Sequence, residues 1–184
     1  MKNRKVVLKM VLSLDGFATS PDGTHDWMFE YFGEDSREWN LSALDAAGTH
    51  AMGRRSYEIM GPHWQASEGP IATSMNEKPK AVFSQTLENA DWGPVEVFGD
   101  LAAAIAELKA RDDDGTILVH GGPTLAKSMT SLGLVDEYQL TWVPLAIGAG
   151  RSPFADLGEH LKLEVVREER FATGALAQLL VPRT

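Results

Sequence analysis

Two short motifs contain the residue types that bind a phosphate. The candidate residues are Gly53, Arg54, Arg55 and Ser56 in the first motif, and Gly121, Gly122, Pro123 and Thr124 in the second. Each is expected to lead from a strand into the first turn of a helix, where unpaired N–H groups and the helix dipole attract anions. Arginines and a hydroxyl strengthen the first motif, and glycines without Cβ atoms let a ligand approach the second closely. Either turn alone is equally consistent with a tight connection and surface arginines, but the two together match the two ends of a dinucleotide.

The elements that would position these motifs alternate along the chain. Short apolar runs predict strands at residues 6–14, 49–52, 80–84, 95–98 and 116–119. Helical periodicity predicts helices at 36–47 with Ser36 as N-cap, from Gly53 to a stop near Gly61–Pro62, after an Asp100 N-cap, and from Pro123 to 132 with Gly133 just past its end. This alternation favours an α/β sheet with helices on its faces.

The pattern changes near the C-terminus. Three strands are expected at 138–145, 161–167 and 175–181, the last two as an antiparallel hairpin. With no repeat or Pro-rich linker, residues 1–184 are expected to form one domain with a mixed, mostly parallel sheet, flanking helices and that hairpin. The aromatic, irregular segment 21–33 is expected to be a lid or a pocket wall.

Composition limits the classes of function. There are 17 Lys and Arg against 26 Asp and Glu, a net charge of −9, which disfavours a nucleic-acid partner. The chain has no cysteine, and its five histidines lack HxxxH or HExxH spacing, so no metal site is expected. Lys9 interrupts the first apolar run and no run approaches the roughly 20 apolar residues of a bilayer span, so we expect a cytoplasmic protein without a membrane partner.

Two common nucleotide fingerprints are absent. The first strand ends in Asp15-Gly16 without the GxGxxG glycines, and there is no GxxxxGK[ST] loop. A Rossmann dehydrogenase and an ATPase of the P-loop type are therefore disfavoured.

Six segments in order carry a resemblance to a known family. They are Ser13-Leu14-Asp15-Gly16, Gly53-Arg54-Arg55-Ser56-Tyr57, Val82-Phe83-Ser84, Val119-His120-Gly121-Gly122-Pro123, Leu134-Val135-Asp136-Glu137, and Gly148-Ala149-Gly150 with Pro153-Phe154. In this order and spacing the chain resembles the dihydrofolate reductase-like superfamily, in the branch of the riboflavin-biosynthesis reductase domain.

The resemblance implies NADPH as cofactor. It implies Arg54 and Ser56 near the cofactor phosphates, Ser84 near the adenosine 2′-phosphate, and the Gly121-Gly122 backbone against the pyrophosphate. It also implies a cis peptide between those two glycines, a conformation that costs several kcal/mol without proline.

The same comparison leaves the catalytic carboxylate open. Dihydrofolate reductases carry one on the helix before the Gly-Arg motif, and here Asp35, Glu38 and Asp45 are nearby without aligning. Asp15, just past the first strand, is the catalytic candidate, although Asp-Gly also simply makes a turn. His120 could touch cofactor, but a hydrogen-bonded histidine at a strand end is the preferred interpretation.

Substrate is expected to enter between residues 16–22, residues 27–32 and the neighbourhood of Trp64. Phe17, Trp27 and Trp64 are the substrate candidates, and Trp39 is a further aromatic near the cleft. We expect an NADPH-dependent reductase of a small heterocyclic or carbonyl molecule. A homodimer is compatible with the sequence. The alternatives are a non-catalytic nucleotide-binding domain and a true dihydrofolate reductase.

Overall fold

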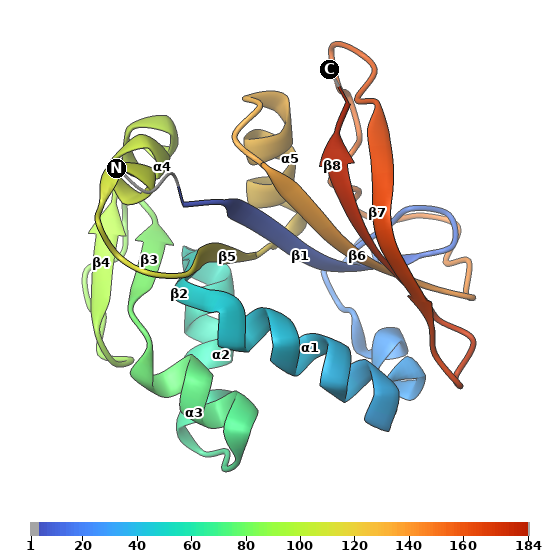
Figure 1. Ribbon diagram of the computed structural model, residues 1–184, viewed down its shortest axis with the longest axis horizontal. Helices are drawn as coiled ribbons and strands as arrows, with labels where there is room; N and C mark the ends of the chain where they lie inside the picture. The colour runs from blue at the N-terminus through green and yellow to red at the C-terminus, as the bar shows by residue number, and fades with distance from the viewer. Residues whose placement is uncertain (1–3, 184) are drawn as a thin grey trace.

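One twisted sheet forms the centre of the molecule. The computed structural model describes residues 4–183, so residues 1–3 and 184 of the predicted domain lie outside the description. The strand order is β4-β3-β2-β5-β1-β6-β8-β7 (Figure 1). The strands are β1 (Val6–Ser13), β2 (Ala47–Gly53), β3 (Lys80–Phe83), β4 (Val95–Phe98), β5 (Thr116–His120), β6 (Glu137–Val143), β7 (Leu163–Arg170) and β8 (Leu176–Pro182).

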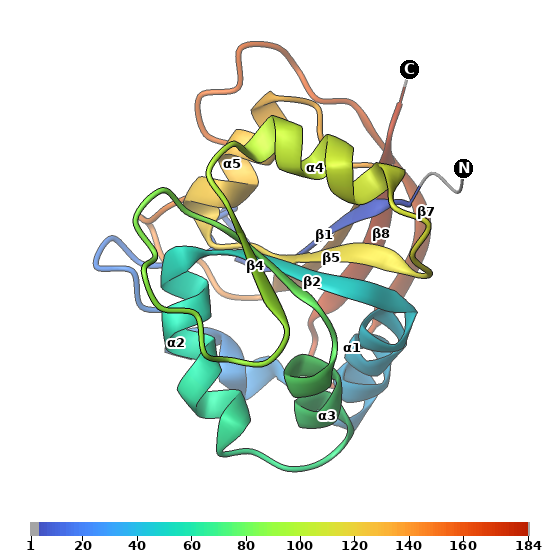
Figure 2. The same cartoon turned by 90° about the vertical axis from the view of Figure 1, so that its left-hand side faces the viewer.

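Helices cover both faces of this sheet. They are the 3-10 helix η1 (Asp26–Tyr31), α1 (Glu34–Ala46), α2 (Arg54–Gln65), α3 (Pro70–Glu77), α4 (Leu101–Ala110) and α5 (Pro123–Ser131). Figure 2 shows α4 and α5 on one face and α1, α2 and α3 on the other. Side chains alternate along β1 between these faces, so Leu8 joins the core under α4 and α5, whereas Val7 joins the core under α1 to α3.

The sheet is parallel from β4 to β6 and antiparallel at its C-terminal end. β6 pairs with β8, and β8 with β7, in antiparallel registers. Because helices connect the parallel strands, β1, β2 and β5 end at the same edge. The predicted mixed, mostly parallel α/β sheet with a C-terminal antiparallel hairpin is confirmed.

Three predicted helix ends are confirmed. The Asp100 carboxylate accepts from Ala103 N–H at 2.8 Å. Pro123 begins α5, and Gly133, with φ +64, follows its last turn. These ends depend on local backbone chemistry, which explains why the sequence alone predicts them.

Other local predictions were wrong. Ser36 is not an N-cap, because α1 begins two residues earlier and the Ser36 hydroxyl accepts from the N–H of the true N-cap, Gly33. α2 does not stop near Gly61–Pro62 but continues to Gln65, with Pro62 in its last turns. Gly61 lies inside the helix and packs against Trp92. A Cβ added at Gly61 would lie 3.5 Å from the Trp92 ring. α3 was not predicted.

The expected cis peptide between Gly121 and Gly122 was also wrong. All peptide bonds of residues 4–183 are trans. Gly122 takes an extended conformation, φ −73 and ψ 151, directly before α5, so an unstrained backbone makes the turn.

Within residues 4–183, no helix combines the length and the apolar character needed to span a bilayer.

Candidate active site

A cleft of about 770 Å³ opens at the edge of the sheet where β1, β2 and β5 end. This volume lies within the range of about 300–1,000 Å³ typical of ligand pockets. Its polar lining consists of Lys9, Thr19, His25, Asn40, Arg54, Arg55, Ser56, His63, His120, Thr124, Ser128 and Arg151. The carboxyl ends of parallel strands are the usual location for ligands in open α/β sheets.

The two predicted anion motifs meet in this cleft. Gly53 and Gly122 each stand in extended backbone directly before a helix, α2 and α5 respectively. The Ser56 hydroxyl lies 3.4 Å from the position of a Cβ added at Gly122, whereas a Cβ at Gly53 would have no atom within 4 Å. Two helix N-termini therefore face one open space, as a ligand with several phosphates requires.

The charge of the cleft is opposite to that of the whole chain. Four cations line it, and no Asp or Glu stands among its described lining residues. Arg54 has only a long 3.7 Å contact with Glu58. The Arg55 guanidinium lies over Gly23, 3.0 Å from that glycine's Cβ position. In a chain of net charge −9, these cations make the cleft locally positive.

Lys9 is the cation at the floor of the cleft. Burial lowers the pKa of its ammonium to about 8, and within residues 4–183 its side chain has no hydrogen-bond or ion-pair partner. Its register neighbour on β5 is His120. Because an unpaired ammonium is unfavourable in a half-buried position, an anionic or acceptor group of a ligand is its natural partner.

A histidine pair continues from Lys9 along the sheet. Nε2 of His50 is 3.1 Å from the Ser74 carbonyl oxygen, so this nitrogen carries the proton and donates. Nδ1 of His50 then accepts from Nε2 of His120 at 3.0 Å, which leaves Nδ1 of His120 as an acceptor. Burial, helped by the charges of His50 and Lys9, holds the pKa of His120 well below its usual value. The preferred interpretation of His120 as a hydrogen-bonded strand-end residue is confirmed.

Two loops close the β1 side of the cleft. Thr19 and Arg151 form an antiparallel bridge, with Arg151 N–H donating to the Thr19 carbonyl at 3.0 Å. Thr19 Oγ1 is buried and has no partner among the described residues, and the Arg151 side chain lines the cleft. This end of the site therefore adds the Arg151 cation to Lys9, Arg54 and Arg55.

Three aromatic side chains form part of the cleft wall. Phe29 and Phe32 stack edge-on with centroids 6.0 Å apart, and Trp64 contributes from α2. Phe29 is 53% exposed. The segment 21–33 is thus a pocket wall, built on η1, as one of the two interpretations predicted.

Four predicted site residues lie outside the lining. Asp15 accepts from the N–H groups of Ile147 and Gly148, at 3.2 and 2.7 Å, and holds that loop. Ser84 Oγ accepts from the two following N–H groups, Thr86 and Leu87. Phe17 packs against Gly150. Trp27 packs, with Trp39, in a core cluster under β6 and β8.

None of the candidate carboxylates on α1 faces the cleft. Asp35 accepts from Ala172 N–H at 2.6 Å, and neither Glu38 nor Asp45 lines the cleft. The residues that α1 contributes to the lining are Asn40 and Leu44. Among the described lining residues, α1 therefore offers an amide and no carboxylate.

Lys9, Asn40 and Arg151 were not predicted as site residues. Lys9 carried a signal, because a charged residue inside an otherwise apolar strand has to face a polar space. Asn40 and Arg151 carried none, since their positions depend on how α1 and two loops pack.

Comparison with known proteins places the chain in a family. The RibD C-terminal domain family matches residues 4–177, and the chain belongs to this family. An uncharacterized protein of Bacillus subtilis, YyaP, is 26% identical over 181 residues, 96% of this chain and 94% of that protein.

Solved structures share the fold. A putative riboflavin biosynthesis protein from Shewanella sp. PV-4 superposes with a TM-score of 0.80 at 21% identity, covering 98% of this chain and 99% of that one. Dihydrofolate reductase from Enterococcus faecalis, in a complex with NADP(H) and RAB-propyl, gives 0.66 at 12% identity, covering 98% and 97%. The predicted dihydrofolate reductase-like fold is confirmed.

Proposed function

We propose that this protein is an NADPH-dependent reductase of a small heterocyclic or carbonyl substrate, similar in chemistry to the reductase step of riboflavin biosynthesis. The observation that carries the proposal is the convergence of two helix N-termini and four cations on one carboxylate-free cleft. Membership in the RibD C-terminal domain family supports it.

The lining residues suit NADPH, an anionic dinucleotide. Arg54, Arg55 and Ser56, with the N–H groups that begin α2, would hold phosphates at one turn. Gly121, Gly122, Pro123 and Thr124 would hold the pyrophosphate at the other. NADPH, when bound, would supply a hydride; the protein's own part is to orient the two reactants and exclude water.

The remainder of the cleft suits a flat, partly polar substrate. Phe29 and Trp64 offer apolar faces for a ring, and Asn40 offers an amide that both donates and accepts hydrogen bonds. Lys9 and Arg151 would neutralise negative charge on the substrate. Folate is less well supported, because α1 contributes Asn40 rather than a carboxylate.

The first test is a parallel titration with NADPH and NADH, followed by nicotinamide fluorescence. We expect NADPH to bind tightly. We also expect Arg54→Ala to weaken NADPH binding more than it weakens NADH binding. Arg37→Ala on the exposed part of α1, outside the cleft, is the matched control. Binding of neither cofactor would overturn the reductase proposal.

The same titrations separate the alternatives. NADPH binding without substrate-dependent oxidation across a broad panel would favour a non-catalytic nucleotide-binding domain. A large thermal shift with methotrexate would favour a dihydrofolate reductase. The homodimer stays a prediction, which light scattering tests directly.

A further inference from the structure

The cleft continues from the two glycine turns into a space bordered by α1, the second half of α2, and α3. Apart from Asn40 and His63, the lining of this helical part of the cleft is apolar and consists of Leu44, Ile59, Met60, Trp64, Ile71 and Met75. Two of these residues are buried, and three more pack against the same core cluster. The helical part of the cleft is therefore a firm apolar surface, continuous with the turns proposed to hold NADPH.

Three large apolar side chains that line the cleft are exposed to water. Phe29 and Ile59 are 53% and 55% exposed, and Phe32 is 37% exposed. Exposed apolar groups that gather in one groove mark a surface that a ligand covers. The exposed apolar rim and the apolar helical wall therefore both favour a ligand with an apolar group.

The lysines that lie near α3 in the sequence are engaged elsewhere. Nζ of Lys78 donates to the carbonyl oxygens of Leu44 and Asp45. Nζ of Lys80 donates to the carbonyl oxygens of Asn76 and Lys78, at 3.0 and 2.9 Å. Among the described lining residues of α1, the second half of α2, and α3, none is a lysine or an arginine. A phosphate or carboxylate tail would therefore find no lysine or arginine partner there.

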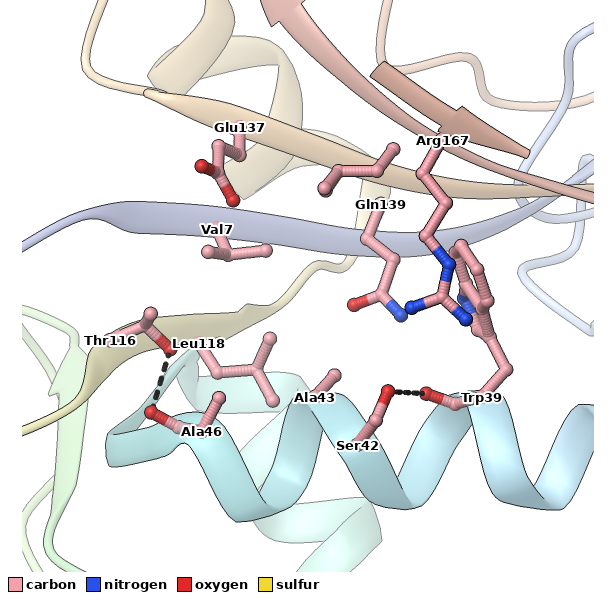
Figure 3. Close-up of a pocket in the computed structure, with 11 residues that line it drawn as sticks. Val7, Trp39, Ser42, Ala43, Ala46, Thr116, Leu118, Glu137, Gln139 and Arg167 are labelled. Carbon is pink, nitrogen blue, oxygen red and sulfur yellow. Dashed lines mark hydrogen bonds between the residues drawn. The ribbon is translucent and has the colours of Figure 1, made fainter. Parts of the chain in front are cut away.

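A separate, smaller crevice lies along another side of α1. It has a volume of about 150 Å³ and shares no lining residue with the cleft. Figure 3 shows Arg167 in this crevice beside Trp39 of α1, and the guanidinium lies over the Trp39 ring, 4.4 Å from its centroid. Because different residues of α1 line the two spaces, Arg167 does not supply a positive charge to the helical part of the cleft.

We propose that the helical part of the cleft binds an uncharged, apolar tail of the substrate, such as a phenyl ring or a short alkyl chain. The carbonyl or heterocyclic head would lie near Lys9 and Asn40, which also line the cleft. Burial of an apolar tail stabilises the complex in proportion to the area removed from water, whereas an unpaired anion would lose its hydration. This inference rests on the proposed reductase function and narrows its substrate class, with discrimination against sugar phosphates.

The test is a nuclear magnetic resonance titration of the full chain, labelled at its methionine methyl groups, with and without NADPH. The probes are butan-2-one, 4-phenylbutan-2-one, which adds a phenyl tail to the same head, and ribose 5-phosphate. 4-Phenylbutan-2-one is expected to bind about tenfold or more tightly than butan-2-one. Its shifts are expected at Met60 and Met75 and not at Met129, a core residue outside the cleft. Ribose 5-phosphate at tens of millimolar is expected to leave the Met60 and Met75 signals unchanged.

Two variants test the apolar wall. Ile59→Gln removes an apolar contact at an exposed position that tolerates a polar side chain, and is expected to weaken 4-phenylbutan-2-one binding about threefold or more. Met60→Gln keeps the length of the side chain and places an amide in the half-buried wall, so a loss of about tenfold is expected. Val166→Gln, at an exposed position on β7 outside the cleft, is the matched control.

Equal affinity for the two ketones, shifts of Met60 and Met75 with ribose 5-phosphate, or unchanged binding in both cleft variants would each overturn the inference. NADPH binding in the same samples tests the reductase proposal separately. NADPH binding with equal ketone affinities would overturn the apolar-tail inference alone. Localised shifts with 4-phenylbutan-2-one in a protein that binds no NADPH would support the apolar tail and overturn the reductase proposal.

Discussion

The Ser56 hydroxyl and the Gly122 backbone face each other across the two strand-to-helix turns, with Oγ 3.4 Å from the position of a Cβ at Gly122. This relationship joins two motifs that are 66 residues apart in sequence, 56 and 122. It brings the two turns to one part of the cleft and supplies the geometry for the first prediction.

Gly122→Ala is expected to fold normally, because φ −73 and ψ 151 suit alanine. Its methyl group would enter the space where a phosphate has to approach the backbone, so NADPH affinity is expected to fall about tenfold or more. Fluorescence titration measures this. Unchanged affinity would show that the ligand does not touch this turn.

Gly121→Ala is the matched contrast. Its Cβ would lie 2.9 Å from Leu8 Cδ1 and 3.3 Å from Met10 Sδ in the core. Overpacking of this kind costs about 1–3 kcal/mol. Urea unfolding is therefore expected to show destabilisation by Gly121→Ala and little change by Gly122→Ala; the reverse order would contradict the description of the turn.

Lys9→Met is expected to stabilise the protein and weaken anion binding together. Methionine removes an unpaired, half-buried ammonium while keeping a similar apolar stem. Urea midpoints and phosphate or NADPH titrations measure the two effects. A destabilised variant would indicate that Lys9 has a structural partner.

The pH dependence of stability gives a second readout for Lys9. Its folded pKa of about 8 lies below the ordinary lysine value of about 10.4, so between these pH values the unfolded chain binds more protons. Stability is therefore expected to rise with pH across that window. Lys80, whose pKa burial also lowers to about 8, contributes similarly, so Lys9→Met is expected to reduce the rise rather than abolish it.

His50 is expected to cause acid destabilisation. Burial lowers its folded pKa to about 4, below the unfolded value of about 6.5, so the unfolded chain binds more protons between these values. The loss of stability from pH 6.5 to 4 is about 3 kcal/mol for this one group. His50→Gln, which can keep both hydrogen bonds without titrating, is expected to flatten this slope, whereas His160→Gln in an exposed loop is the control. Equal slopes in both variants would contradict this.

Asp15→Asn tests whether Asp15 positions a loop. The Ser13 hydroxyl, followed by the N–H groups of Gly148 and Ile147, holds the pKa of Asp15 below its ordinary value. Asparagine offers one acceptor oxygen instead of two, so faster hydrogen exchange is expected at Ile147 and Gly148. Unchanged exchange combined with lost reductase activity would restore Asp15 as a catalytic candidate.

The sequence by itself determined the strands, the α-helices other than α3, and the two glycine motifs. Gly53, Ser56, Gly121 and Gly122 are local signals, because strand-to-helix turns need particular residue types within a few positions. The Asp100 cap and the C-terminal hairpin follow from the same short-range chemistry. Lys9 was visible as a charge in an apolar strand, although its partner was not.

Only the tertiary structure decided which side chains enter the cleft. Asp15 follows closely after β1, yet its carboxylate accepts hydrogen bonds from the N–H groups of Ile147 and Gly148 instead of lining the cleft. Asn40 lines the cleft from α1, whereas Asp35, Glu38 and Asp45 do not, because the rotation of α1 about its axis is fixed by packing against the sheet rather than by local sequence. Arg151 reaches the site through a backbone bridge to Thr19. Such long-range contacts depend on how distant segments pack, which no spacing along a single chain encodes.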